Sequence, residues 1–333
     1  MLDLAPVVSG STSGDALRNS LDLVQRVEAL GYLRYWVAEH HNMPGIASSS
    51  PAVLLAHAAS VTSTIRVGSG GVMLPNHSSL VIAEQFGTLE ALHPGRIDLG
   101  LGRAPGTDML TARALRRVGA SGMDDDFPDQ LVELFGYFSG SFPADHPYRH
   151  INANPGRGNQ PDIWLLGSSD YSARAAGRLG LPFSFAHHFA ADNTEAAVQV
   201  YRESFQPSAE LAEPYVMLGV SAVAAETDER ARWLAAPGSL AFLRLRTGRP
   251  GLYPTAEEAA AYNFTPAEKD FVRGWTKSHI IGAPEVVAAG IHELTERTGA
   301  DELMITTMVS DHKDRIHSYE LIAELAGLTA PAA

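Results

Sequence analysis

The sequence predicts an α/β fold of the (β/α)₈ TIM-barrel class, with a single domain over residues 1–333. Short apolar runs alternate with amphipathic segments along the whole chain, which is the pattern of βα units around a parallel sheet. Eight such units can be counted, and neither a linker nor a shift in composition divides them. Two Rossmann-like halves therefore fit the chain less well than one closed barrel.

The expected strands are short apolar runs at residues 2–5, 35–38, 65–68, 97–101, 163–166, 182–186, 215–224 and 302–307. The expected helices carry apolar residues at helical spacing, at residues 15–30, 53–60, 80–92, 131–138, 169–179, 194–205, 227–235, 284–298 and 316–325. In the first of these helices Asp15 is expected to be the N-cap, and Gly31 to mark the end.

Residues 237–277 contain no evident strand and are rich in helix-breaking residues, among them Gly248, Pro250 and Pro254. We therefore expect an irregular insertion before the last βα unit, acting as a loop or lid. Because neither motif nor spacing constrains its shape, the substrate cannot be read from the sequence.

Composition excludes several classes of function. Lys+Arg number 25 and Asp+Glu 38, so the net charge is 25 − 38 = −13, which argues against a nucleic-acid partner. The absence of cysteine excludes disulfides, thiolate metal sites and a cysteine nucleophile. No apolar run is long enough to span a membrane, and no basic leader precedes Leu2. A cytoplasmic enzyme that takes its redox chemistry from an organic cofactor is expected.

In a (β/α)₈ barrel the active site lies where the strands end at their carboxyl termini. The residues that follow five of the expected strands are polar, cationic or glycine: 39–42, 70–71, 102–106, 167–169 and His187-His188. Arg103, Ser168 and Ser169 could together hold a phosphate, aided by free N–H groups at a helix start. The alternative is that the serines only cap a helix and Arg103 only pairs with Asp98 or Asp108.

His40 could act as a general acid or base, or it could be a hydrogen-bonded structural residue. His40 and His41 are adjacent and would point to opposite sides of an extended chain, so they could hardly bind one metal. The acidic run 124–126 is most simply a solvated loop, and we predict no metal site. The Gly-rich run 100–106 is only a weak match to a dinucleotide-binding motif.

With these residues in view, the chain resembles the bacterial-luciferase-like flavin monooxygenases over nearly its whole length. Five motifs carry the resemblance, in the order YWVAEHHN at 35–42, GSGGVMLPNH at 68–77, AEQF at 83–86, PGRIDLGLGR at 94–103 and LGSS at 166–169. It is closest to a single-chain subgroup that includes tailoring enzymes of polyketide pathways.

The resemblance implies FMN as the cofactor, used in reduced form with O₂ through a flavin C4a-hydroperoxide. Arg103 matches the arginine that binds the FMN phosphate, and Ser169 and Ser172 match the second phosphate-binding segment, next to Ser168. His40 matches the active-site histidine. Gly70-Gly71 matches a non-prolyl cis peptide beneath the flavin ring.

The resemblance also implies two partners, a separate NAD(P)H:flavin reductase and a second copy of the chain in a homodimer. The substrate would be a small organic molecule, such as a polyketide-like compound. Trp36, Met73 and Phe185 are candidate apolar walls of a dry mouth that protects the flavin hydroperoxide, and the alternative is that they belong to the core. Ser168 stands where luciferase has a glutamate, so aldehyde oxidation and light emission do not follow. A deazaflavin-dependent oxidoreductase and a flavin-binding protein without turnover are the alternatives.

Overall fold

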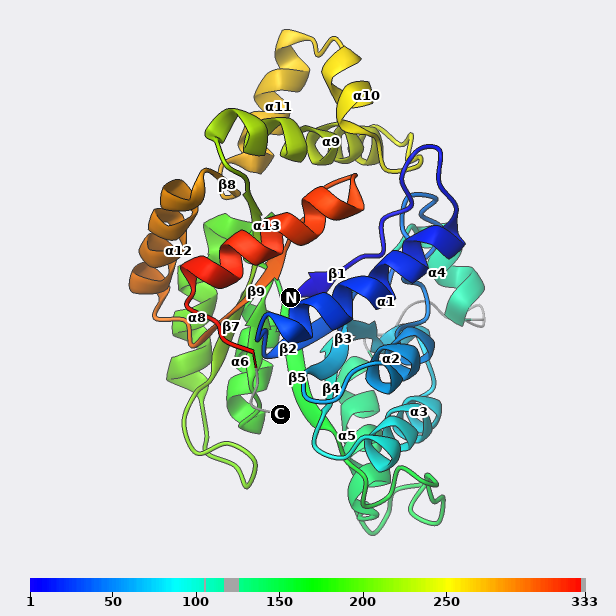
Figure 1. The fold of residues 1–333 in the computed structure, drawn as a ribbon. Helices are drawn as coiled ribbons and strands as arrows, with labels where there is room; N and C mark the ends of the chain where they lie inside the picture. Colours follow the sequence, from blue (N-terminus) through cyan, green and yellow to red (C-terminus); the bar gives the residue numbers. More distant parts are fainter. Residues whose placement is uncertain (105, 117–125, 331–333) are drawn as a thin grey trace.

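The computed structural model describes residues 1–104, 106–116 and 126–330, so Asp124 and Asp125 of the acidic run lie outside it. Its centre is a curled sheet of nine parallel strands (Figure 1). The strands are β1 (Leu2–Asp3), β2 (Arg34–Val37), β3 (Arg66–Met73), β4 (Ile97–Gly102), β5 (Asp162–Gly167), β6 (Phe183–Phe185), β7 (Val216–Ala224), β8 (Ile280–Gly282) and β9 (Glu302–Thr306). The predicted α/β fold with a parallel sheet is confirmed.

The strands pair in chain order from β1 to β8, while β9 pairs with the first part of β7, from Met217↔Glu302 to Ser221↔Thr306. β8 pairs with the last part of the same strand. The sheet curls until β9 lies beside β1. The eight predicted strands correspond to β1–β7 and β9, and β8 was missed because three residues are too few to show a period.

Helices surround the sheet (Figure 1). They are α1 (Ser13–Ala29), α2 (Pro51–Ser60), α3 (Ser79–Leu92), α4 (Met109–Arg116), α5 (Phe127–Ser139), α6 (Asp170–Leu179), α7 (His187–Ala190), α8 (Thr194–Ser204), α9 (Asp228–Arg246), α10 (Ala256–Ala261), α11 (Pro266–Thr276), α12 (Pro284–Thr298) and α13 (His312–Leu325). Two short 3₁₀ turns span Leu74–Asn76 and Ala191–Asn193. The cap of α1 is Thr12, and Asp15 completes a capping box from inside the helix, so the predicted cap was wrong by three positions.

The prediction of an irregular segment at 237–277 was wrong. α9 continues through the buried Pro237 to Arg246, and α10 and α11 follow it. Each of these two helices begins with a capping box, Thr255 with Glu258 and Thr265 with Glu268, which satisfies backbone N–H groups at the helix start. Figure 1 shows α9, α10 and α11 grouped together at one end of the molecule.

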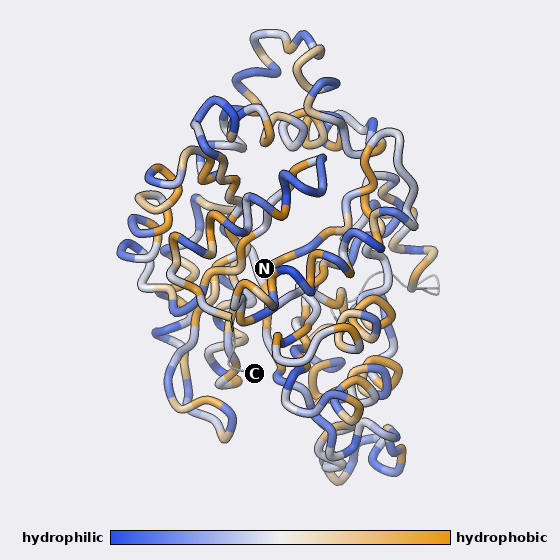
Figure 2. The backbone as a smooth tube through the Cα atoms, viewed as in Figure 1, coloured by the Kyte–Doolittle hydropathy of each residue, from blue (hydrophilic) through white to orange (hydrophobic). Residues whose placement is uncertain are grey.

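Two apolar layers hold the sheet in place. The larger layer lies between the strands and the surrounding helices and includes Val67, Leu99 and Phe86. The smaller one contains side chains from β1, β2, β5, β7 and β9, including Trp36, Trp164 and Met304. Figure 2 shows apolar residues along the central strands and a mixed pattern on the outer helices. No helix in the described ranges is both long and apolar enough to cross a membrane.

A buried ionic network joins the beginnings of several strands. Asp98 on β4 accepts hydrogen bonds from Arg34 at 2.9 Å, from Arg66 at 2.6 Å and from the Trp36 indole at 2.8 Å. Arg34 also contacts Glu302 on β9 at 3.1 Å. Because the Asp98 side chain is completely buried, loss of its charge would leave two arginines without their main buried partner.

A second buried ion pair lies nearby. Arg315 on α13 donates to Asp3 on β1 at 2.8 Å and to the Thr307 carbonyl at 2.9 Å. Asp3 also accepts hydrogen bonds from Ser20 and Tyr35. Burial raises the pKa of Asp3, but Arg315 and these hydroxyl groups outweigh it and hold the pKa below its usual value. This pair therefore joins the first strand to the segment that follows the last one.

We predict that Asp98→Ala lowers the free energy of unfolding by about 3–5 kcal/mol, because Arg34 and Arg66 lose their fully buried partner and the buried Trp36 indole N–H loses its acceptor. The matched control is Asp162→Ala, which removes a carboxylate that also contacts Arg66 but is 62% exposed. Its expected cost is below about 1 kcal/mol. Urea unfolding midpoints measure both, and equal midpoints for the two variants would contradict the prediction.

Candidate active site

A cavity of about 640 Å³ opens at the carboxyl ends of the strands. Its floor includes Ser221 and Val223 of β7 and Thr306 of β9, and α9 and α11 contribute much of its wall. The loop after β2 adds Met43, Gly45 and Ile46, and the segment between α9 and α10 adds Leu252 and Tyr253. The cavity therefore lies under the 237–277 segment, where the sequence predicted a lid.

Stacked aromatic rings form one wall of the cavity. Phe242 of α9 stacks on Trp275 of α11 with ring centroids 4.2 Å apart and planes 6° apart. Phe271 also stacks on Phe242, at 5.4 Å, but it does not line the cavity. Trp275 also contacts the His279 ring edge-on. Phe242 and Trp275 thus give the cavity an apolar aromatic wall.

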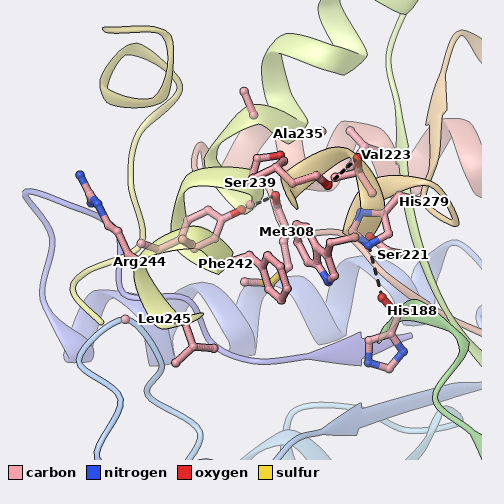
Figure 3. Close-up of a pocket in the computed structure, with 18 of the residues that line it drawn as sticks. His188, Ser221, Val223, Ala235, Ser239, Phe242, Arg244, Leu245, His279 and Met308 are labelled. Atoms are coloured by element: carbon pink, nitrogen blue, oxygen red, sulfur yellow. Dashed lines mark hydrogen bonds between the residues drawn. The ribbon is translucent and has the colours of Figure 1, made fainter. Parts of the chain in front are cut away.

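Two histidines mark the other side of the cavity (Figure 3). His188 Nδ1 lies 3.0 Å from the Gly219 carbonyl oxygen, and His279 Nε2 lies 3.3 Å from the His188 carbonyl oxygen. Burial lowers the pKa of each histidine to about 4. Both imidazoles are therefore neutral at neutral pH.

Next to the cavity, Glu39 organises the loops that follow β2 and β3. One carboxylate oxygen lies 2.8 Å from Nε2 of both His41 and His77, and the other accepts the Met73 N–H at 3.0 Å. Burial of Glu39 raises its pKa, but hydrogen bonds from the two histidines and from Met73 outweigh this and lower it. The carboxylate thus stays ionised and ties two strand ends together.

His40 is held by its backbone, whose N–H donates to the Ser48 carbonyl at 3.1 Å. Its Nδ1 is buried and has no hydrogen-bond partner among the described residues. Burial lowers the pKa of His40, Glu39 raises it and His41 lowers it, with a net lowering. His40 is also close enough to His188 to lower that residue's pKa. A neutral imidazole with an unused nitrogen therefore lies near the cavity.

The Gly70–Gly71 peptide bond is cis, as the family resemblance implied. A Cβ at residue 70 would lie 2.8 Å from the Leu2 side chain, and one at residue 71 would lie 2.7 Å from the Gly100 carbonyl oxygen. Residue 71 therefore has no room for a side chain, and a side chain at residue 70 would require Leu2 to shift.

Arg103 and the start of α6 are brought together. The Arg103 guanidinium lies over the Tyr171 ring, with Cζ 4.0 Å from the ring centroid. Ser169 precedes the helix in extended conformation, but its hydroxyl makes no capping hydrogen bond. Ser168 and Ser169 are exposed and Ser172 is buried. The helix start therefore has N–H groups and hydroxyls available for an anion beside a cation.

Asp98, which the sequence offered as an alternative partner for Arg103, instead binds Arg34 and Arg66. The other alternative, Asp108, accepts hydrogen bonds from Asn42 and Thr111.

The predicted site residues lie outside the lining of the large cavity. His40 lies close to His188, which lines the cavity. Gly70 and Gly71 lie in β3, Arg103 directly follows β4, and residues 168–172 span the β5–α6 loop and the start of α6. Among the candidate walls, Trp36 and Phe185 are wrong because both are almost completely buried in the core. Met73 is partly exposed at the end of β3.

The sequence placed His187-His188 at a strand end but gave neither a role, and it did not point to His279. His188 lies in α7, shortly after β6, and nothing in the sequence distinguishes it from His187, whose Nδ1 binds Thr194 instead. His279 lies in a segment without a recognisable pattern. The capping boxes at 255–258 and 265–268 were the available signal that helices cover the cavity.

Comparisons with known proteins agree with this arrangement. A family described as luciferase-like monooxygenase matches residues 2–302. A luciferase-like monooxygenase of Escherichia coli strain K12 is 46% identical over 98% of this chain and 96% of its own length. The N-acetyl-S-alkylcysteine monooxygenase of Bacillus subtilis strain 168 is 35% identical over 97% of this chain and 96% of its own length.

Among solved structures, apo-MsnO8 is 37% identical with a TM-score of 0.89, covering 99% of this chain and 98% of its own. The oxygenating constituent of 3,6-diketocamphane monooxygenase from Pseudomonas putida, solved with FMN, is 18% identical with a TM-score of 0.73, covering 99% and 98%. The coenzyme F420-dependent tetrahydromethanopterin reductase of Methanopyrus kandleri is 15% identical with a TM-score of 0.66, covering 97% and 98%. The last two likenesses concern the fold alone.

We predict that Glu39→Gln destabilises the protein most at neutral pH. The folded protein lowers the Glu39 pKa, so the ionised carboxylate contributes stability above about pH 4.3, its unfolded value. This contribution is lost as the pH falls through the folded pKa. Urea midpoints of the wild type and variant from pH 7 to pH 3 should therefore converge toward acid, whereas a gap that stays constant would contradict the prediction. Glu293→Gln, at an exposed glutamate of α12, is the control and should show little gap throughout.

Proposed function

The chain belongs to the luciferase-like monooxygenase family, and from this premise we propose that it is an FMN-dependent monooxygenase. It would use reduced FMN and O₂ to oxygenate a small, largely apolar organic molecule. The observation that carries the proposal is the division of the strand-end face into two parts. One part offers an anion site beside bare backbone, and the adjoining part is an apolar cavity.

The described residues fit FMN. Its phosphate would lie against Arg103, Ser168, Ser169, Ser172 and the free N–H groups at the start of α6. Its flat ring system needs a surface without side chains, and the Gly70–Gly71 backbone is such a surface. The fit is that of a planar group with a phosphate tail, which supports FMN.

When bound, reduced FMN would supply the electrons that activate O₂. The chain's own task is to control protons and water. The aromatic wall of α9 and α11 covers the cavity and would keep water from the reacting groups. His40 Nδ1 is unpartnered and its imidazole is neutral, so it can accept a proton there or hold one in place.

We propose that the reduced FMN comes from a separate NAD(P)H:flavin reductase, as a diffusing co-substrate. The sequence has no G-x-G-x-x-G motif, the usual signature of a nicotinamide dinucleotide site. The exposed positions of Arg103, Ser168 and Ser169 support exchange of the flavin with solvent.

We also propose a homodimer formed through α2 and α3. Most residues of both helices are apolar, and the outward side chains Val53, Val81 and Leu92 are exposed. Large apolar side chains grouped on one exposed face are typical of an interface between proteins. A second copy that covers this face would remove these side chains from water. Light scattering at micromolar concentration should give twice the chain mass, and a single chain mass would refute the dimer.

The function is tested by mixing the protein anaerobically with chemically reduced FMN, admitting O₂ and following products from a panel of apolar thioethers and ketones. Formation of an oxygenated product supports the proposal. If all consumed O₂ becomes hydrogen peroxide with every compound, the proposal fails. Tighter equilibrium binding of F420 than of FMN would instead favour the deazaflavin oxidoreductase. Retained flavin that does not react with O₂ would favour a flavin-binding protein without turnover.

We predict that Arg103→Ala weakens FMN binding about 10- to 150-fold, because a charge-assisted contact to phosphate contributes about 1.5–3 kcal/mol. Flavin fluorescence titration measures the affinity. Riboflavin, which lacks the phosphate, should bind the wild type and the variant equally. Arg178→Ala, at the other end of α6, is the matched control and should bind FMN as the wild type does. A parallel loss of riboflavin binding would contradict the assignment.

We predict that His40→Ala leaves FMN affinity within a few-fold of wild type but lowers turnover by about 10²–10⁴, the range for a lost general acid or base. Steady-state rates with saturating reduced FMN measure the effect. His41→Ala should disturb the Glu39 cluster and lower stability more than His40→Ala does. Equal rates for the His40 variant and the wild type would rule out a catalytic role.

A further inference from the structure

The polar groups of the large cavity are unevenly distributed. Figure 3 shows His188 and His279 together at one end of the drawn residues and Arg244 at the opposite end, with Phe242 and Met308 between them. The charged lining residues are all basic, namely Arg232, Arg244, Lys269 and Arg273. No carboxylate lies among the described lining residues, so hydrogen-bond acceptors near the floor come from neutral groups.

The tautomer of His188 is set by its neighbour. A backbone carbonyl can only accept, so the Nδ1 atom that lies 3.0 Å from the Gly219 oxygen must carry the proton in the neutral ring. Nε2 is then a free acceptor, and it has no hydrogen-bond partner among the described residues. A Cβ at residue 219 would lie 2.8 Å from Nδ1. Glycine at this position is therefore what lets the ring approach the strand.

The groups around His188 preserve this state. The ionisable neighbours that act on it are His279, His187 and His40, and a positive charge on any of them would oppose protonation of His188. Burial acts in the same direction. The His188 backbone is held in place by His279, whose Nε2–H donates to its carbonyl at 3.3 Å. Nε2 is thus positioned and available as an acceptor across the neutral pH range.

We propose that His188 is a substrate-binding residue and that the substrate is a flat, largely apolar molecule with an O–H or N–H donor. This inference rests on the proposed function only in taking the cavity as the substrate site. The donor would meet Nε2 of His188, and the apolar part of the molecule would lie against the side chains of Phe242 and Trp275 that line the cavity. A phenol is the simplest compound with both features.

The test compares two probes of nearly equal shape, 2-naphthol, which has a donor, and 2-methoxynaphthalene, which has none. Isothermal titration calorimetry at pH 7 measures their binding to the full chain without flavin. We expect 2-naphthol to bind the wild type about 5- to 10-fold more tightly, the ratio typical of one hydrogen bond. Because neither flavin nor O₂ is present, failure here is distinguishable from failure of the monooxygenase proposal.

Two variants isolate Nε2. In His188→Asn the amide can still donate to the Gly219 carbonyl but reaches no further, so the ratio should fall to about 1. In His188→Gln the longer side chain can carry an acceptor oxygen toward the former Nε2 position, so part of the preference should return. The matched control is His187→Asn, at the adjacent histidine that binds Thr194 outside this cavity, and it should keep the wild-type ratio.

Three results would overturn the proposal. They are the absence of binding by either probe to the wild type, equal affinity of the wild type for both probes, and an unchanged ratio in His188→Asn. Circular dichroism of each variant shows whether it is folded. If His188→Asn does not fold, His188→Phe replaces it in the test, because phenylalanine has no acceptor nitrogen. A folded His188→Phe that still prefers 2-naphthol over 2-methoxynaphthalene as strongly as the wild type does overturns the proposal.

Discussion

Asp98 is a fully buried carboxylate that links side chains of neighbouring strands. Its carboxylate binds side chains from β2 and β3, and Arg34 continues the network to Glu302 on β9. A carboxylate in that position loses its hydration, so it is tolerable only while all its partners are in place. The network thereby holds β2 and β9, which do not pair with each other, at a fixed separation. The pair between Asp3 and Arg315 acts in the same way between β1 and the segment after β9.

The ionic network lies where the strands begin, so the residues at their carboxyl ends can differ from strand to strand. The ends of β3, β4 and β5 carry bare glycine backbone, Arg103 and an uncapped helix start. The ends of β7 and β9 instead form the floor of an apolar cavity beneath α9 and α11. One fold therefore places a site suited to an anion beside one suited to an apolar ring. The ionised Glu39, which binds both His41 and His77, holds the loops after β2 and β3 at this boundary.

The histidines near the cavity share one electrostatic property. His40, His188 and His279 all have lowered pKa values because burial disfavours the charged imidazole. A neutral ring offers both a donor and an acceptor, and in His188 and His279 a backbone carbonyl decides which nitrogen donates. At neutral pH His188 and His279 therefore offer hydrogen bonds without adding to the charge of the four basic residues that line the cavity.

Much of this protein could be predicted from its sequence, because strand and helix periods are local properties. Eight strands, the helices after them and the proximity of Arg103 to the serines of residues 168–172 follow from the alternation of apolar runs and from where each run ends. Local pattern also contained the capping boxes of α10 and α11, although the glycines and prolines of residues 248–254 suggested irregular structure. The pairing of Asp98 with Arg34 and Arg66 rather than with Arg103 was decided by tertiary structure. Tertiary structure also decided that Trp36 and Phe185 are buried in the core, and that His188 rather than His187 lines the cavity. In each case the deciding factor is the direction of a side chain relative to elements far away in the sequence, which no local period encodes.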